Sequence, residues 1–361
     1  MSARAPHLVV MAAGTGGHVI PGLAVAREMQ SRGWTVSWLG TSSGMENRLV
    51  PPTGIALDTI SFSGLRGKGL LHTLTGGMRL LVAFWSCLSI LRRRQPTAVL
   101  GMGGYVCFPG GMMASLLGKP LVLVNSDASL LLSNKALMPV ADRVIFGFDG
   151  QAAQSVRRAV VTGNPVRSEI EAIAPPQERF AGRSGPLRLL VVGGSLGARV
   201  LNETVPQAVA MLEPANRPLV VHQCGVSDPS AVQAAYAKAG VAAQVCPFID
   251  DMAQQLAQCD LVICRAGAIT VSELCAAGVP AVLVPLLVST TTHQRDNAKW
   301  MARAQAALHL PQAELSAPAL ANLIRGFTRE ALLQMAQCAR ALARPHAAAR
   351  VADEIESVVA A

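Results

Sequence analysis

Residue types suited to binding a nucleotide diphosphate are concentrated between Cys264 and Asn297. An apolar run ends at Cys264, a turn of small residues follows, and a helix is predicted to begin at Ala268 with Glu273 in its second turn. Backbone N–H groups at a helix start can bind an anion, and a carboxylate can accept hydrogen bonds from both ribose hydroxyls. This pattern predicts the site of a donor such as a nucleotide sugar.

Three glycine-rich turns follow apolar runs elsewhere in the chain, at residues 13–18, 101–105 and 193–197. The first and third lead directly into predicted helices. Glycine lets a phosphate approach the main chain, and the helix start supplies donors. One such turn can serve packing alone, but three in two domains that face one cleft favour phosphate binding.

Apolar runs and helical patterns alternate twice along the chain, which predicts an α/β fold of two doubly wound, Rossmann-like domains facing a cleft. Buried parallel strands are predicted at residues 8–13, 35–39, 98–102, 121–125, 143–148, 160–162, 187–192, 219–223, 244–248, 261–264 and 281–284. Helices are predicted at residues 20–31, 70–94, 110–117, 198–212, 230–239 and 347–359.

Turn residues at 163–165 interrupt this alternation and mark the expected domain boundary. The first domain is predicted to span residues 1–164 and the second 165–344, with the polar stretch 174–186 as a surface loop. The C-terminal helix, residues 345–361, is expected to pack back on the first domain.

Composition narrows the function classes. With 51% hydrophobic and 15% charged residues, the chain is neither a disordered protein nor a coiled coil. A net charge of +9 favours an anionic partner. Aromatic residues make up only 4% and are not interleaved with basic ones, so nucleic acid is not the expected partner.

The eight cysteines include no Cys-x-x-Cys pair and predict reduced thiols in a cytosolic protein. No stretch is apolar enough for a signal peptide or a spanning helix, so any membrane contact is expected to be peripheral. No Asp-x-Asp and no cluster with metal-ligand spacing occurs in the sequence. We therefore expect neither a metal nor another cofactor.

Two other enzyme classes fit less well. A nicotinamide-dependent oxidoreductase needs a third glycine where Val19 stands, and a ribose-binding acid where residues 40–43 read Gly-Thr-Ser-Ser. Residues 193–197 formally match the Gly-x-Ser-x-Gly of hydrolases, with His293 following in the expected order. However, this run opens its domain and continues into phosphate-loop glycines, which favours the phosphate reading.

Six motifs in one order carry a resemblance that covers nearly the whole chain. They lie at residues 14–18, 101–105, 162–167, 193–198, 248–252 and 265–273. The chain resembles the MurG family of bacterial N-acetylglucosaminyltransferases. The resemblance implies a GT-B architecture and inverting transfer of GlcNAc from UDP-GlcNAc to the C4 hydroxyl of MurNAc in lipid I, giving lipid II for peptidoglycan synthesis. Another GT-B lipid glycosyltransferase, a UDP-sugar epimerase and a non-catalytic nucleotide-sugar-binding scaffold remain alternatives.

The resemblance also assigns roles to single residues. The main chain at Ile249 would read the uracil edge with Arg167 nearby, and Ser195 would bind phosphate. Gln294 and Asn297 would contact the sugar hydroxyls. The ribose and diphosphate would be held by Ala268, Ile269, Thr270, Val271, Ser272 and Glu273. The residues facing the reacting carbon would be Thr15, Gly16, Gly17 and His18.

One motif departs from the family. Where the family shows His-Glu-Gln-Asn, this chain has Val124-Asn125-Ser126-Asp127, so Asp127 stands in the slot of an asparagine expected to touch the donor sugar. His18 is the predicted general base because it is the histidine placed in a glycine loop and histidine is the usual base near neutral pH; Asp127 is the second candidate. His18 could instead only order its loop. Helix starts and backbone amides, not a metal, are expected to stabilise departing UDP.

The predicted helix at residues 70–94 could contact a membrane. Leu74, Met78, Leu81 and Trp85 recur at helical spacing between basic residues, which is typical of a helix on an anionic bilayer. The alternative is a helix that only covers the sheet. Gly103, Gly104 and Tyr105 would then receive the acceptor diphosphate. The expected location is the cytoplasmic face of the inner membrane, with other cell-wall synthesis and division proteins as further partners implied by the resemblance.

Two polar residues in the second domain need separate interpretation. His222 lies inside a predicted buried strand and is expected to be a hydrogen-bonded core histidine. Arg265 could pair either with a phosphate or with an acid such as Asp260.

Overall fold

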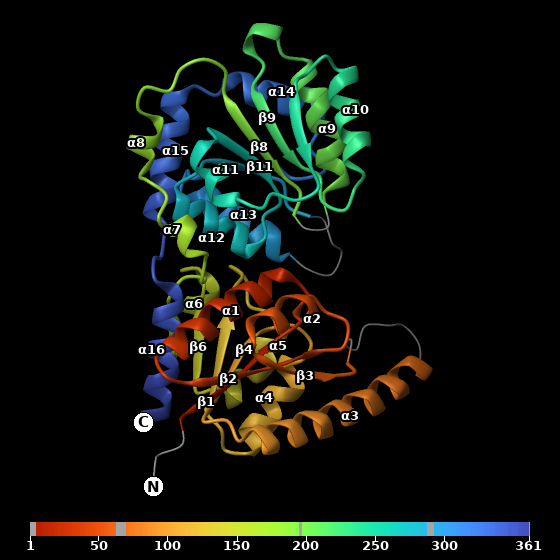
Figure 1. Cartoon of the computed structure of the whole chain (residues 1–361), viewed down its shortest axis with the longest axis vertical. Helices are drawn as coiled ribbons and strands as arrows, with labels where there is room; N and C mark the ends of the chain where they lie inside the picture. The colour runs from red at the N-terminus through yellow and green to blue at the C-terminus, as the bar shows by residue number, and fades with distance from the viewer. Residues whose placement is uncertain (1–4, 63–69, 195–196, 287–291, 361) are drawn as a thin grey trace. The chain divides into compact units, whose positions relative to one another are not determined.

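The computed structural model describes residues 5–62, 70–194, 197–286 and 292–360, with the side chains of residues 70–75 excepted. The chain forms two compact units (Figure 1). Unit 1 comprises residues 1–166 together with 346–361, and unit 2 comprises residues 167–345.

Unit 1 is built on a seven-stranded parallel sheet in the order β3-β2-β1-β4-β5-β6-β7. The strands are β1 His7–Ala12, β2 Thr35–Thr41, β3 Ala56–Ile60, β4 Ala98–Gly103, β5 Leu121–Asn125, β6 Arg143–Phe146 and β7 Ala159–Val161. The strand order reverses between β1 and β4: the chain adds β2 and β3 on one side of β1 and then β4 to β7 on the other. Loops that follow these two strands therefore meet at the carboxyl edge, where doubly wound sheets bind ligands.

Helices cover both faces of this sheet. The helices of unit 1 are α1 Gly16–Ser31, α2 Glu46–Leu49, α3 Leu70–Arg94, α4 Cys107–Leu116, α5 Leu132–Leu137, α6 Gln151–Gln154 and α16 Ala347–Ala360, with 3₁₀ turns at Pro51–Thr53 and Met138–Val140. Residues Leu8 and Val10 of β1 pack with α1 and α16 on one face. Val9 and Met11 pack with α3 and α4 on the other, as the period-two alternation of a strand requires.

The C-terminal helix α16 packs on α1 although unit 2 separates them in the sequence. Arg32 forms ion pairs with Asp353 at 2.7 Å and Glu356 at 2.8 Å. The Trp34 indole donates to Glu356 at 3.1 Å. Val351 and Ile355 are fully buried beneath these polar contacts, so α16 completes one face of the unit 1 core.

Unit 2 contains a six-stranded parallel sheet in the order β10-β9-β8-β11-β12-β13. The strands are β8 Arg188–Val192, β9 Leu219–Gln223, β10 Ala243–Cys246, β11 Leu261–Cys264, β12 Ala281–Leu283 and β13 Ala307–His309. Here the strand order reverses between β8 and β11, because β9 and β10 lie on one side of β8 and the later strands on the other. The prediction of two doubly wound parallel sheets is confirmed.

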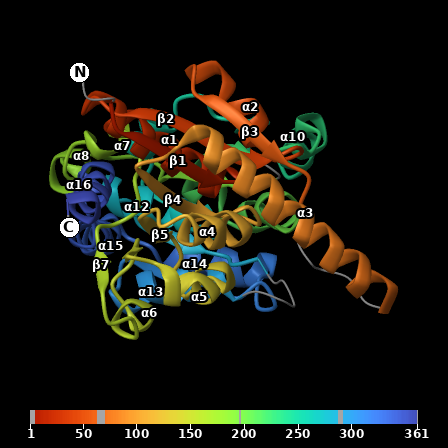
Figure 2. The ribbon, with the colours of Figure 1, turned by 90° about the horizontal axis from the view of Figure 1, so that it is seen from below.

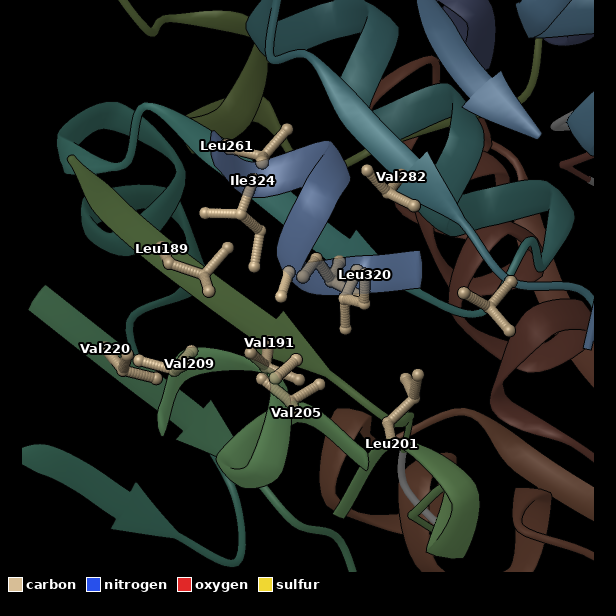
Figure 3. Packing of buried hydrophobic residues seen from close by; sticks show 14 of the residues in the cluster. Leu189, Val191, Leu201, Val205, Val209, Val220, Leu261, Val282, Leu320 and Ile324 are labelled. Atoms are coloured by element: carbon tan, nitrogen blue, oxygen red, sulfur yellow. The ribbon is translucent and has the colours of Figure 1, made fainter. Parts of the chain in front are cut away.

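The helices of unit 2 pack around a core centred on β8 and α9. They are α7 Ser168–Glu171, α8 Pro176–Phe180, α9 Arg199–Ala210, α10 Pro229–Lys238, α11 Met252–Gln258, α12 Ala268–Ala277, α13 His293–Arg303, α14 Ala317–Gly326 and α15 Arg329–Ala341, with a 3₁₀ turn at Pro214–Asn216. Figure 3 shows Val205 of α9 and Leu320 of α14 directed toward Val191 of β8. This core holds the carboxyl ends of β8 and β11 in place.

Three local expectations differ from the structure. Strands β3 and β13 were not predicted, because β3 carries Asp58 and Thr59 in a short edge segment and β13 has only three residues. The expectation of a surface loop at residues 174–186 is wrong, since this stretch contains α8. Phe180 at the end of α8 is buried in the unit 2 core, so one aromatic residue anchors an otherwise polar segment.

Candidate functional site

The helix start predicted as a diphosphate site is present as the N-terminus of α12. This helix begins at Ala268, directly after β11 and a three-residue turn, and its N-cap is Gly267 in an extended conformation. Glycine has no side chain to cap the first-turn N–H groups, which therefore face outward as donors for an anion. The chain thus brings a positive helix end to the carboxyl edge of the unit 2 sheet.

The opposite end of α12 is held by two guanidinium groups. Arg179 donates to the carbonyls of Ala277 at 2.9 Å and Gly278 at 2.5 Å, and Arg340 donates to the carbonyl of Ala276. Gly278 ends the helix in the left-handed region at φ 63°. Cations at a helix C-terminus complement its dipole, so these contacts fix α12 from its far end.

Glu273 is held in one orientation by Arg167. Arg167 Nε and Nη2 both donate to Glu273 Oε1, at 3.0 and 2.9 Å. Burial raises the pKa of Glu273, while the charge and hydrogen bonds of Arg167 act in the opposite direction. The carboxylate side chain is only 13% exposed, and both bonds fall on one oxygen, so Oε2 is left as the acceptor for a ligand hydroxyl.

The glycine loop after β8 requires glycine at several positions. Gly194 and Gly197 have φ values of 85° and 76°, in a region that residues with a Cβ rarely adopt. A Cβ on Gly197 would also lie 2.3 Å from the Cys224 carbonyl oxygen. The loop leads into α9, whose N-cap is Ala198. Ser195, predicted to bind phosphate, lies outside the described residues.

Ile249 and this loop are joined by a residue that the sequence did not single out. The backbone N–H of Ile249 donates to Gln223 Oε1 at 3.1 Å. Gln223 Nε2 donates to the Gly194 carbonyl at 3.3 Å. The signal in the sequence was a polar amide side chain at the last position of a buried strand, β9.

Gln294 and Asn297 brace neighbouring loops in this structure. Gln294 Oε1 accepts from the Leu286 N–H at 2.9 Å. The amide of Asn297 is fully buried and donates to the Ala266 carbonyl at 3.1 Å. Asn297 therefore supports the turn that precedes α12, and Ser272 Oγ within α12 donates to the Ala268 carbonyl at 2.9 Å.

Of the two partners considered for Arg265, a phosphate or an acid such as Asp260, the structure does not pair it with Asp260. Arg265 donates to Gln312 at 2.8 Å and to the Val284 carbonyl at 3.1 Å. Asp260 is fully buried and is bound by Arg183 at 2.5 Å and by Arg329 at 3.3 Å. The charge of Asp260 is therefore satisfied by other cations. Arg265 instead links the end of β12 to Gln312 in the loop after β13.

In unit 1, the glycine loop at residues 13–18 is fastened by a buried acid. Glu46 Oε2 accepts from the Gly14 N–H at 3.0 Å, and Oε1 accepts from the Thr41 N–H at 2.8 Å and its hydroxyl at 2.7 Å. Gly40 and Gly44 leave space for the carboxylate, because a Cβ on either would overlap it. Glu46 was not among the predicted residues, since it follows β2 at a distance of several residues.

His18 lies against the second glycine turn of unit 1. Gly103 has φ 125°, and a Cβ there would be 2.4 Å from His18 Nδ1. The Ala13 N–H donates to the Gly103 carbonyl at 3.3 Å, and Gly104 packs on the Ala13 carbonyl. The structure thus brings the predicted base together with Gly103, Gly104 and the adjoining Tyr105 at the switch point between β1 and β4.

Residues 124–127, where the sequence differs from the family motif, form an ordered loop. Asn125 is fully buried, donates to the carbonyls of Asp127 at 2.7 Å and Ser129 at 3.1 Å, and accepts from the Leu131 N–H at 2.9 Å. Asn164 donates to the Ser126 carbonyl at 2.9 Å. Asn125 therefore shapes the loop that carries the half-buried Asp127.

The core interpretation of His222 is confirmed. Its Nδ1 lies 2.9 Å from the Tyr236 hydroxyl and its Nε2 lies 3.0 Å from Asn202 Oδ1. Burial lowers the pKa of His222 to about 4, so the ring is neutral near pH 7. Burial likewise raises the pKa of the Cys264 thiol to about 12, which keeps it protonated.

Helix α3 has two apolar faces. Ala83, Cys87 and Leu91 are buried against the sheet. Met78, Leu81 and Trp85 are 67%, 60% and 70% exposed, and Val82 lies among them at 55%. Figures 1 and 2 show the N-terminal end of α3 extending beyond the sheet of unit 1. The side chain of Leu74 lies outside the described residues.

Within the residues that the structure describes, no helix is long and apolar enough to cross a bilayer. The same part of the chain contains no cluster of three His, Cys, Asp or Glu side chains that could hold a metal ion.

Two family models match consecutive parts of the chain. The glycosyltransferase family 28 N-terminal domain matches residues 8–146, and the corresponding C-terminal domain matches residues 188–354.

Full-length relatives carry one name. A protein of Methylibium petroleiphilum, UDP-N-acetylglucosamine–N-acetylmuramyl-(pentapeptide) pyrophosphoryl-undecaprenol N-acetylglucosamine transferase, is 71% identical over 358 residues, 98% of either chain. A relative of the same name from Chromobacterium violaceum is 66% identical over 348 residues, 96% of either chain. Among solved structures, Acinetobacter baumannii MurG superposes with a TM-score of 0.84 at 39% identity, covering 98% of this chain and 99% of that one.

Proposed function

We infer the reaction of this chain from its family: the chain belongs to the MurG family within glycosyltransferase family 28. It is a UDP-GlcNAc-dependent N-acetylglucosaminyltransferase that transfers GlcNAc to lipid I and yields lipid II in peptidoglycan synthesis. The name shared by its full-length relatives favours this reaction over the epimerase and scaffold alternatives. The donor assignment rests on one arrangement: the start of α12 has no side-chain cap, and Glu273 in the same helix is hydrogen-bonded to Arg167.

The donor is proposed to bind at the carboxyl edge of the unit 2 sheet. The first-turn N–H groups of α12, from Ala268 to Thr270, and the loop containing Ser195 take the diphosphate. Glu273 Oε2 accepts the ribose hydroxyls, which Arg167 favours by occupying Oε1. Ile249 reads the uracil edge, and Gln294 lies near the sugar. Val271, Ser272 and Asn297 support this surface from within.

The acceptor is proposed to be handled by unit 1. The turn of Gly103, Gly104 and Tyr105 receives its diphosphate, and Thr15, Gly16 and Gly17 border the reacting carbon. His18 removes the proton of the C4 hydroxyl as that oxygen attacks the anomeric carbon, and UDP leaves with its charge stabilised by N–H groups at helix starts. Asp127 is the second candidate base.

Contact with the membrane is proposed to occur through the exposed stripe of α3. Met78, Leu81 and Trp85 present apolar area on one side of the helix. Arg92 lies in its last turn, where Arg93 and Arg94 pair with Asp58. Apolar side chains enter the interface while arginines attract anionic headgroups. The enzyme would act at the cytoplasmic face of the inner membrane as a peripheral protein.

Donor binding and turnover test the central assignment. We expect Glu273→Ala to weaken UDP-GlcNAc binding at least tenfold in calorimetry, because the ribose hydroxyls lose a charged acceptor. Glu203→Ala is the matched control, since Glu203 belongs to an exposed ion pair with Arg199. UDP release should require a lipid I analogue. Release without acceptor would indicate an epimerase or hydrolase, and no release would indicate a scaffold.

The base is tested by pH–rate profiles. His18→Asn should lower kcat by about 10²–10⁴-fold and remove the acidic limb of the profile. If Asp127→Asn has that effect and His18→Asn does not, Asp127 is the base.

The membrane role is tested by vesicle sedimentation. Changing Met78, Leu81 and Trp85 together to Ser should abolish binding to anionic vesicles. A triple change of Leu132, Leu219 and Val226 to Ser, at exposed apolar positions outside α3, serves as the control. Unchanged binding of the α3 variant would remove this surface from the proposal.

A further inference from the structure

We propose that Gln223 is a positioning residue for the nucleoside end of the donor, because its side chain fixes the backbone of Ile249 relative to the glycine loop after β8. This inference rests on the proposed function, which places a uridine diphosphate at these loops. It assigns the discrimination of the base to a residue that does not itself touch the ligand.

Gln223 occupies the last position of β9, the strand beside β8. Its side chain is 3% exposed and reaches two loops at once. Oε1 accepts from the Ile249 N–H at 3.1 Å, and Nε2 donates to the Gly194 carbonyl at 3.3 Å. The backbone carbonyl of Gln223 also accepts from the Gly193 N–H at 3.4 Å. One residue therefore connects the proposed uracil-reading segment with the proposed phosphate loop.

The two bonds require a neutral amide at this position. The Ile249 N–H needs an acceptor, and the Gly194 carbonyl needs a donor, so a carboxylate would satisfy the first and repel the second. An apolar side chain would satisfy neither. An amide also adds no negative charge beside a loop that is proposed to bind a diphosphate. Glutamine is therefore the side chain whose length and hydrogen-bonding groups meet all three conditions.

A buried polar chain keeps this strand end rigid. His222, the preceding residue, lies between the Tyr236 hydroxyl and Asn202 Oδ1. Asn202, in the first turn of α9, in turn donates to the Cys224 carbonyl at 3.2 Å and to Ser227 Oγ at 3.1 Å. The residues on both sides of Gln223 are thus hydrogen-bonded into the core. A support of this kind lets a side chain hold a binding loop in one position.

The two hydrogen bonds that the Gln223 side chain makes to Ile249 and Gly194 should have a specific effect on function. If Ile249 reads the base edge, it does so through its carbonyl, because its N–H donates to Gln223. That carbonyl can accept from the N3–H of uracil but would face an acceptor at N3 of cytosine, so its placement sets the preference for uracil. Loss of the two hydrogen bonds should then raise KM for the donor and reduce base discrimination. It should leave kcat near its original value, because no reacting atom is involved.

The test compares Gln223→Met with Gln233→Leu. Methionine has nearly the size of glutamine but forms neither hydrogen bond. Gln233 is an exposed residue of α10 that donates to the Ala243 carbonyl, and its loss should change nothing. For Gln223→Met we expect KM for UDP-GlcNAc to rise about tenfold, as the loss of one to two hydrogen bonds implies. The ratio of CDP to UDP dissociation constants should fall by at least threefold, with kcat within twofold of the original.

Gln223→Glu keeps the inference falsifiable if the methionine variant does not fold. It retains the acceptor for Ile249 but loses the donor to Gly194 and adds a negative charge beside the proposed diphosphate loop, so its KM should rise at least as much while its base discrimination should be largely kept. A folded variant with unchanged KM and unchanged CDP-to-UDP ratio would overturn the inference alone. Failure of the original chain to bind UDP-GlcNAc would instead overturn the proposed function and this inference with it.

Discussion

The first glycine loops of the two units are fastened in corresponding ways, one by a charged side chain and the other by a neutral one. Each loop follows the third strand from one edge of its sheet, β1 or β8. Each is held by a residue at or after the end of the neighbouring strand: Glu46 begins α2 after β2, and Gln223 ends β9. In unit 1 the fastening group is the carboxylate of Glu46, which takes the Gly14 N–H. In unit 2 it is the neutral amide of Gln223, which takes the Gly194 carbonyl.

This difference separates two loops that look alike in the sequence. The buried carboxylate of Glu46 takes the Gly14 N–H just before α1 and so places a negative charge near the start of that helix. The amide of Gln223 in unit 2 binds the Gly194 carbonyl and adds no negative charge beside the start of α9. The comparison favours unit 2 as the diphosphate-binding unit and leaves the loop of unit 1 to place His18.

Removing the carboxylate in unit 1 should have the largest effect on stability. Glu46→Ala leaves the buried N–H groups of Gly14 and Thr41 without their acceptor, so we expect a loss of about 3 kcal/mol or more in denaturant unfolding. Binding of UDP to the remaining folded protein should be unchanged. Glu203→Ala, at an exposed position, provides the control. Weakened UDP binding would contradict the division of roles between the loops.

Lowering the pH should reduce the stability of unit 2, because His222 is neutral when buried and gains a proton on unfolding. Its pKa is lowered from 6.5 to about 4 in the folded chain, so the unfolded chain binds more protons between these values. Stability is therefore full above pH 6.5 and falls by about 3 kcal/mol as the pH decreases to 4. Unfolding followed by a probe in unit 2 should show this slope, and His222→Asn should remove most of it. An identical slope in the variant would assign the effect to other groups.

Alanine at matched glycines compares the loops directly. Gly14 and Gly194 have φ values of 97° and 85°, and neither has an atom within 4 Å of a built Cβ. Each substitution should cost about 1–2 kcal/mol of backbone strain. Only Gly194→Ala should weaken UDP binding, by a few-fold in calorimetry. Equal weakening by both variants would break the distinction drawn above.

The exposed end of α16 should give the smallest effect. Asp353→Ala removes one of the three carboxylates that pair with Arg32, and Asp353 is 65% exposed. We expect less than about 1 kcal/mol of destabilisation, seen as a small shift of the thermal midpoint and lost at high salt. A larger change would show that this pair orders the helix.

Local patterns in the sequence predicted the sheets and the start of α12, because apolar runs and glycine turns are signals within a few residues. They did not predict Glu46 or Gln223. Both residues act on a loop that is distant in the sequence and adjacent only once β1 pairs with β2 and β8 with β9. The same holds for the contact between Arg167 and Glu273, where resemblance named both residues but not their bond. Asn125 replaces a family glutamate, and only its three loop bonds reveal a structural role.

The position of α16 has a consequence for synthesis of the chain on the ribosome. Unit 2 is continuous in sequence and can complete its core as soon as residue 345 has emerged, whereas unit 1 still lacks its last helix. Until then the surface of α1 that α16 covers is open. The half translated first is thus the half finished last, and a nascent chain stopped before residue 347 should bind chaperones through unit 1.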